Sequence, residues 1–198
     1  MPLNKKNSIN LFYSFLILHA FVWTLIPALT NNNLPLDTIE ALAWGSNLDW
    51  GYNKHPPMSA FFVEIIYKIF GPQDWAYYLL SQLFVIFSFF IVFRLGEKIF
   101  NNKVLSLLSV LVLEGIYFYN FTTPEFNVNV CQLPFWSLVI YYSWLIYDKK
   151  KLCFKDCLLL GLFAGFGFLS KYLFLYLIFS IFLFFILMMI RNKKNFLV

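Results

Sequence analysis

The sequence predicts an all-α, polytopic integral membrane protein with about six transmembrane helices. Its 198 residues are 61% hydrophobic, 22% aromatic and 13% charged, whereas soluble domains are roughly 45–50% apolar and about 25% charged. Apolar runs recur along the chain at lengths near the roughly 20 residues that a helix needs to cross a bilayer. Basic residues cluster between these runs, as is typical of membrane proteins with a fixed topology.

Twelve of the fifteen Lys and Arg residues fall into four clusters that the apolar runs would place on one face of the membrane. The clusters are Lys5/Lys6, Arg94/Lys98/Lys103, Lys149/Lys150/Lys151/Lys155 and Arg191/Lys193/Lys194. Because cytoplasmic loops are enriched in Lys and Arg, we expect all four clusters, and both termini, to be cytoplasmic. The net charge of +5 is thereby accounted for. No basic patch remains for nucleic acid, and we expect no nucleic-acid partner.

Five apolar segments give six expected spans. They are Asn10–Leu29, Trp75–Phe93, Val104–Phe121, Val128–Tyr147 and Cys157–Ile190. As one helix the last segment would be about 50 Å long, so we divide it at Ser170–Tyr172 into a short span and a longer one. This division keeps the final basic cluster on the cytoplasmic side. The first segment could also be a cleaved signal peptide, but it exceeds the usual apolar core of about 7–15 residues, which favours an anchor.

The three cysteines suggest no metal site. Cys153 and Cys157 form a Cys-x3-Cys pair near the expected cytoplasmic face, and Cys131 lies within a span. A zinc site needs more ligands than this pair offers. A disulfide is not expected in a reducing compartment. We therefore interpret all three as core-facing or lipid-facing thiols.

The loop over residues 30–74, between the first two spans, carries two carboxylates just beyond the exit of a membrane helix. We expect a short helix over Thr38–Trp44 that Asp37 caps. Glu40, three residues after Asp37, would share its helical face. We expect a second, amphipathic helix over Pro57–Phe70 that lies along the membrane surface. Asp37 and Glu40 are the candidate catalytic residues. The plain alternatives are a cap without chemistry for Asp37 and a solvated charge for Glu40.

Other polar and aromatic residues on the expected outer face are candidates for binding. Lys54, His55 and Lys171 are the cations there, and Lys171 could instead be a lysine that extends to the interface. Trp44 and Tyr52 could be interfacial aromatic residues. Two further candidates, Glu125 and Asn129, lie at the outer end of the fourth span. For Glu114, inside the third span, we expect a buried polar contact.

Several motifs, spread in order across most of the chain, resemble one enzyme family. They are Asp37 with Glu40-Ala-Leu-Ala-Trp44, Trp50-Gly-Tyr-Asn-Lys-His-Pro-Pro-Met58, Thr123-Pro-Glu-Phe-Asn-Val-Asn129 leading to Pro134-Phe-Trp136, and Gly161–Tyr172 with its Leu-Ser-Lys-Tyr ending. The chain resembles the polyprenol-phosphate-sugar-dependent glycosyltransferases of the GT-C superfamily. The resemblance is to the protein-mannosyltransferase-like and aminoarabinose-transferase-like bacterial branch, glycosyltransferase family 39. The first-loop motif is fairly specific, whereas the Ser-Lys-Tyr ending alone is weak.

This resemblance implies a membrane-embedded enzyme that uses a polyprenyl-phosphate-linked sugar. In such enzymes the acidic residue of the first outer loop acts as catalytic base or orients the acceptor, and Asp37 matches it. Charge that develops on the leaving phosphate needs a cation or a metal nearby. Where the family often has an Asp, this chain has Glu125, and Asn127 or Asn129 is the alternative equivalent. This departure leaves a two-carboxylate role and the use of a divalent metal open.

The resemblance also implies a location and a size. We expect a bacterial inner-membrane protein that acts at the periplasmic face on lipid A or its core, another envelope glycan or a protein. Members of the family are longer, so we expect residues 1–198 to be one membrane domain, the N-terminal part of a longer enzyme, and inactive alone. The alternative is a non-catalytic membrane subunit or a truncated remnant.

Overall fold

A computed structural model describes residues 5–149 and 153–195, and the prediction of an all-α fold is confirmed: this part of the chain contains helices and no strands. Eight α-helices and two 3₁₀ turns follow one another in the described ranges. They are α1 (Lys5–Thr30), α2 (Leu36–Gly45), α3 (Met58–Phe70), α4 (Asp74–Phe100), α5 (Lys103–Glu114), η1 (Tyr117–Tyr119), α6 (Val128–Asp148), α7 (Phe154–Ser170), η2 (Tyr172–Phe174) and α8 (Leu175–Asn195).

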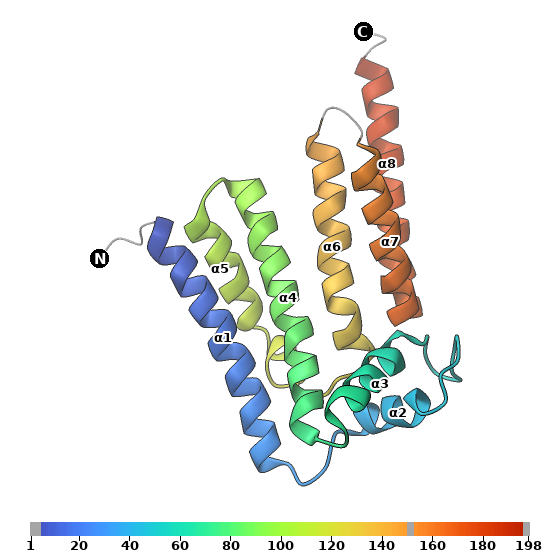
Figure 1. Cartoon of the computed structure of the whole chain (residues 1–198). Helices are drawn as coiled ribbons and strands as arrows, with labels where there is room; N and C mark the ends of the chain where they lie inside the picture. Colours follow the sequence, from blue (N-terminus) through green and yellow to red (C-terminus); the bar gives the residue numbers. More distant parts are fainter. Residues whose placement is uncertain (1–4, 150–152, 196–198) are drawn as a thin grey trace.

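The long helices run up and down, and the connections gather at two opposite ends (Figure 1). One end, which we call the basic end, holds the N-terminal end of α1, the C-terminal end of α8, the α4–α5 turn, the end of α6 and the start of α7. The other, which we call the loop end, holds α2, α3, η1 and η2. Basic clusters from all four connections and termini thus share one end, as the expected topology requires. Lys150 and Lys151 lie outside the described residues.

Four helices in the described part of the chain are long and apolar enough to cross a membrane. They comprise Asn7–Thr30, Asp74–Phe100, Val128–Asp148 and Tyr172–Arg191. These agree with the first, second, fourth and last expected spans. A lipid environment favours such helices because each backbone N–H and C=O group is satisfied within the segment. The fifth expected span is the 17-residue α7, short as predicted.

The expected third span, Val104–Phe121, is wrong at its end. Helix α5 stops at Glu114 after 12 residues, about 18 Å of helix. Beyond it, polar side chains bond the backbone in place of a continued helix: Asn120 Nδ2 donates to the Glu114 carbonyl oxygen at 2.7 Å, and Thr122 Oγ1 donates to the Phe118 carbonyl oxygen at 2.7 Å. Such local bonds compete with helical ones, so residues 116–127 form an irregular segment at the loop end.

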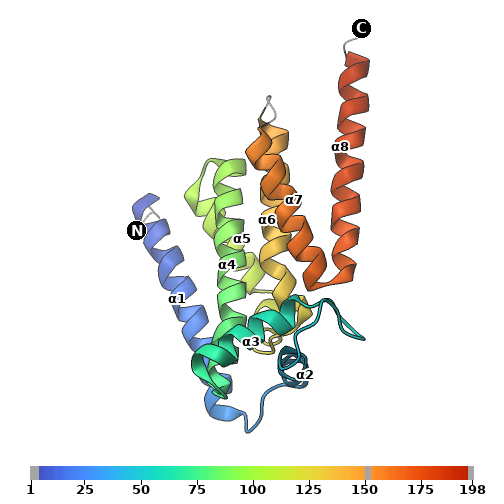
Figure 2. The same cartoon turned by 45° about the vertical axis from the view of Figure 1, so that its right-hand side comes forward.

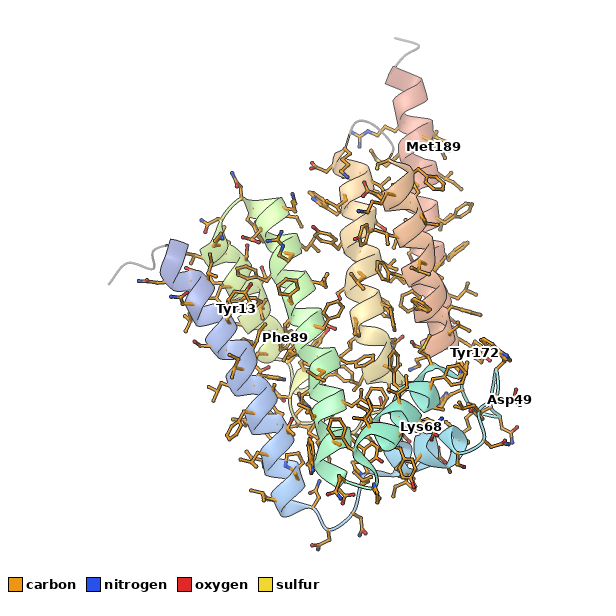
Figure 3. All side chains as sticks on the ribbon, in the orientation of Figure 1. Tyr13, Asp49, Lys68, Phe89, Tyr172 and Met189 are labelled. Atoms are coloured by element: carbon orange, nitrogen blue, oxygen red, sulfur yellow. The ribbon has the colours of Figure 1, made fainter. Side chains whose placement is uncertain are left out.

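The core lies between α1, α4, α5 and α6. Phe12 of α1 and Phe89 of α4 are fully buried, and Phe89, labelled in Figure 3, lies between the helices. Phe12 stacks on Phe93 with ring centroids 4.0 Å apart. Helices α4 and α5 approach closely at Gly96, where an added Cβ would lie 3.0 Å from Ser106 Cα. Small residues permit such close backbone contact in membranes.

Helix α8 stands apart from the rest of the bundle (Figure 2). Only 6% of its most apolar stretch is buried within the protein, against 61% for α4. A helix that is hydrophobic on all sides and makes few protein contacts is suited to lipid. In α8, Leu177, Ile178 and Ile181 pack against the core beside α6 and α7. The turn that precedes it is nevertheless well packed, because Phe174 of η2 is fully buried.

Candidate active site

Helix α2 presents Asp37 at the loop end, in its first turn rather than as its cap. The prediction that Asp37 is the cap is wrong: Pro35 precedes the helix, with φ of −58°, and its carbonyl oxygen accepts bonds from the N–H groups of Thr38 and Ile39, each at 3.1 Å. The fixed φ of proline suits it to the start of a helix. Asp37 is favoured in the first turn because a negative charge there complements the helix dipole.

A second carboxylate, that of Glu125, lies against the start of α2. The Asp37 backbone N–H donates to Glu125 Oε1 at 3.0 Å, and Thr38 Oγ1 donates to the Phe126 carbonyl oxygen at 3.1 Å. These two bonds join the loop 30–74 to a segment almost ninety residues later. Among the described residues, no side-chain hydrogen bond engages the carboxylate of Asp37 itself. It is half-buried, and it remains free to accept a proton.

Glu40 and Lys54 form an ion pair beside Asp37. Lys54 Nζ lies 2.5 Å from Glu40 Oε1, with the Lys54 side chain 60% exposed and that of Glu40 28% exposed. The hydrogen bond and charge of Glu40, together with the charge of Asp37, raise the pKa of Lys54 above its ordinary value of 10.5. Lys54, in the loop between α2 and α3, is thus a positive charge held at the side of α2 by Glu40.

Aromatic side chains form a small cluster at the end of α2. Trp44 stacks on Tyr52 with centroids 5.2 Å apart and an interplanar angle of 12°, and His55 meets the Trp44 ring edge-on at 5.9 Å. The Tyr52 hydroxyl donates to the Trp44 carbonyl oxygen at 3.0 Å and accepts from the Asp49 N–H at 3.1 Å. These bonds fold the loop 46–57 back on α2, where Lys54 contacts Glu40 and His55 contacts Trp44.

Lys171 lies at the α7–α8 turn and donates a short hydrogen bond from Nζ to Asn129 Oδ1, at the start of α6. Asn127 is occupied differently: its Oδ1 caps α6 by accepting from the N–H groups of Asn129 and Val130, at 2.9 and 3.2 Å. Of Asn127 and Asn129, it is therefore Asn129 whose side chain contacts another candidate site residue, Lys171. Tyr172 extends to the loop that carries Asp49 (Figure 3), and its hydroxyl oxygen would lie 3.8 Å from a Cβ added at Gly51.

The structure thus brings all nine predicted site residues to the loop end, in two groups. One group surrounds α2 and consists of Asp37, Glu40, Trp44, Tyr52, Lys54, His55 and Glu125. The other is the Asn129–Lys171 pair. Between the two groups, no hydrogen bond or ion pair is formed by the described side chains. In the same described ranges, no three His, Cys, Asp or Glu side chains are grouped so as to hold a metal ion.

Sequence reasoning missed a polar group inside the bundle. Glu114 makes the buried polar contact expected of it, and its partner is His19 of α1, at 2.9 Å between Oε2 and Nδ1. His19 also contacts Gln82 of α4 at 3.0 Å. The available signal was an ionisable or amide side chain within an apolar span, which is rare enough to indicate function.

Comparison with known proteins places the chain. The sequence model of the dolichyl-phosphate-mannose-protein mannosyltransferase family matches residues 54–198. The undecaprenyl phosphate-alpha-4-amino-4-deoxy-L-arabinose arabinosyl transferase of Wigglesworthia glossinidia brevipalpis is 29% identical over 127 residues, which is 63% of this chain and 22% of that protein. The chain thus spans about a fifth of this curated relative's length. No solved structure matches it.

The family match includes Lys54, His55, Glu125, Asn129 and Lys171, whereas Asp37 and Glu40 precede the matched residues. The helical bundle and the apolar spans described above are those of a membrane protein. With most of its length matched, the chain belongs to the dolichyl-phosphate-mannose-protein mannosyltransferase family.

Proposed function

We propose that residues 1–198 are the N-terminal membrane domain of a glycosyltransferase that moves a sugar from a polyprenyl-phosphate donor to a cell-envelope acceptor. The loop over residues 30–74 carries the site. We place the reaction at the periplasmic face of a bacterial inner membrane, with both termini cytoplasmic. The acceptor is lipid A or its core, another glycan or a protein. The observation that carries the proposal is the contact of Asp37 with Glu125 beside Lys54, in a chain of this family.

Asp37 is the proposed base. An acceptor hydroxyl attacks the anomeric carbon of the sugar, its proton passes to the Asp37 carboxylate, and the bond from that carbon to the phosphate oxygen breaks. The polyprenyl phosphate leaves with the electron pair, and the configuration at the sugar inverts. A carboxylate without a hydrogen-bond donor of its own suits this role, since a bond donated to it would lower its basicity.

The lysines are proposed to bind the phosphate. Lys54 is bonded to Glu40, and we assign Glu40 to orient Lys54 beside the base. Lys171, held by Asn129, supplies a second cation from the other group. Preorganised positive charge stabilises a leaving phosphate where negative charge develops. Trp44, Tyr52 and His55 are proposed to contact the sugar or the acceptor.

The test is Asp37→Asn in the intact protein that contains this chain, assayed for sugar transfer in membranes. We expect transfer to fall by about 10²–10⁴-fold, which is the usual contribution of a general base, with unchanged protein level. Asp49→Asn is the matched control, because Asp49 is an exposed carboxylate of the same loop that bonds only the Trp50 N–H in the described chain.

Equal transfer by both variants would remove Asp37 from the mechanism. An intact protein that transfers no sugar in any form would favour the non-catalytic alternative. Residues 1–198 alone are proposed to be inactive, because the relative with a named transferase function is several times longer than this match. Transfer by the purified 198-residue chain would contradict that part of the proposal.

A further inference from the structure

A group of polar side chains lies inside the helix bundle, apart from the residues assigned to the reaction. The group consists of His19 on α1, Ser81 and Gln82 on α4, Glu114 on α5, and Thr123 in the irregular segment 116–127. His19 is 4% exposed, and Ser81, Gln82 and Thr123 are fully buried. We call this group the buried polar relay. Polar groups in such a place destabilise the fold unless they are bonded to one another.

The first link of the relay is a close polar contact between α1 and α5. His19 Nδ1 lies 2.9 Å from Glu114 Oε2. Of the charged groups in the described chain, Glu114 is the one within ion-pair distance of His19. The rings of Phe15, Trp23 and Phe89 surround the imidazole. The pair anchors the end of α5 to the middle of α1.

The second link runs from His19 through Gln82 to Thr123 in the irregular segment. His19 Nε2 lies 3.0 Å from Gln82 Oε1, and Gln82 Nε2 donates to Thr123 Oγ1 at 3.5 Å. The neighbouring Ser81 hydroxyl donates a short bond to the Thr123 carbonyl oxygen. Thr123 is thus held at its side chain and at its backbone by two successive residues of α4.

Thr123 lies two residues before Glu125, whose carboxylate receives the Asp37 N–H. We infer that His19 and Gln82 are positioning residues: the buried polar relay holds the segment 116–127 so that Glu125 meets the start of α2 beside Asp37. This inference rests on the proposed function for its link to catalysis. The position of the segment itself can be measured without any sugar transfer.

A merely structural role would have a different consequence. If the relay only stabilised the bundle, its loss would lower the unfolding temperature, while the folded molecules would keep segment 116–127 in place. Loss of a positioning contact would release the segment while the helices stay assembled. Gln82 separates the two roles, because its replacement breaks the side-chain link to Thr123 and the contact with His19 Nε2, while the His19–Glu114 contact does not involve Gln82.

The experiment is a distance measurement by pulsed electron spin resonance on the full chain in nanodiscs. Spin labels are attached at Ala43→Cys on α2 and Thr122→Cys in the segment, both exposed positions. The exposed Cys153 and Cys157 are replaced by Ser, and the buried Cys131 stays. The variants are Gln82→Leu and the flexible, similarly sized Gln82→Met.

Gln132→Leu is the matched control, because the side chain of Gln132 bonds Trp136 Nε1 within its own helix. With the relay unmodified and in Gln132→Leu, we expect one narrow population of distances between the two spin labels. In both Gln82 variants, we expect that single population to be lost while the helix content stays unchanged. A narrow population in folded Gln82→Leu, or in Gln82→Met if the first variant does not fold, would overturn the inference. A released segment in a protein that transfers no sugar would remove only the link to catalysis.

Discussion

The two ends of the bundle use their charges differently. At the loop end, polar contacts join residues far apart in the chain: Asp37 with Glu125, separated by 88 positions, and Lys171 with Asn129, separated by 42. At the basic end the pairs are local. Glu97 contacts Arg94 at 3.0 Å and Lys103 at 3.3 Å, and Lys149 contacts Asp156 across a single connection.

This difference separates two kinds of information in the sequence. Local pairs of the basic end mark where helices stop, and the same charges set the expected topology. Long-range contacts of the loop end are made only after the bundle has assembled. Substitutions at the loop end should therefore affect the site, whereas substitutions of the local pairs should affect little, and four variants test this contrast.

The largest effect is expected for Gly167→Ala, within α7. An added Cβ would lie 2.2 Å from Cζ of the fully buried Phe174 ring, so η2 and the adjoining Lys171 must shift. Overpacking of this kind costs about 1–3 kcal/mol, and transfer should fall as Lys171 leaves Asn129. Thermal unfolding in detergent measures the cost. Gly161→Ala in the same helix is the control, because no atom lies within 4 Å of the added Cβ. An equal loss of stability in Gly161→Ala would contradict the attribution of the effect to Phe174.

Glu125→Ala is expected to come next. It removes the acceptor for the Asp37 N–H at 3.0 Å, and a partly buried donor left unbonded costs about 1–3 kcal/mol. Glu125→Gln keeps an acceptor oxygen at the same place and should recover most of the stability. Unfolding of the two variants, compared with the parent chain, measures the difference; equal stability of all three would show that the contact does not hold α2.

Glu40→Gln should change the site without unfolding it. The bond and charge of Glu40 raise the pKa of Lys54. The stability of this pair is fully present below the ordinary lysine pKa and is lost as the pH rises through the raised pKa. In the variant, Lys54 should become reactive to an acylating reagent at lower pH, as read by mass spectrometry. Glu64→Gln, which removes the partner of Lys68, serves as the control and should leave the Lys54 profile unchanged.

Arg94→Gln at the basic end should have the smallest effect. Arg94 pairs with Glu97 three residues later, and its side chain is 51% exposed. Exposed pairs of this kind contribute about 0.2–1 kcal/mol. We expect a small change in unfolding temperature and unchanged sugar transfer by the intact protein. A loss of stability as large as that of Glu125→Ala, or a loss of transfer, would show that the two ends are coupled.

The spans could be predicted because hydropathy and length are local properties of the sequence, and α1, α4, α6 and α8 follow them. The end of α5 could not, because Ile116–Tyr119 is apolar and aromatic, whereas Asn120 and Thr122 divert the backbone through bonds that the sequence does not reveal. The sequence identified the candidate site residues, and all of them lie at the loop end. It did not identify their partners, because Glu125 contacts α2 and His19 contacts Glu114 only through tertiary packing.

The isolation of α8 has a consequence for how the protein enters the membrane. Its span is the most apolar of the four and has the smallest buried share, 6%, whereas that of α6 is the least apolar and is 39% buried. A strongly apolar helix partitions into lipid on its own. Helix α6 carries Asn129, Gln132 and Ser137 in its span, and needs neighbouring helices to cover them. During synthesis, we therefore expect α6 to enter the lipid only together with the helices that cover its polar residues. Helix α8 can leave the insertion machinery by itself.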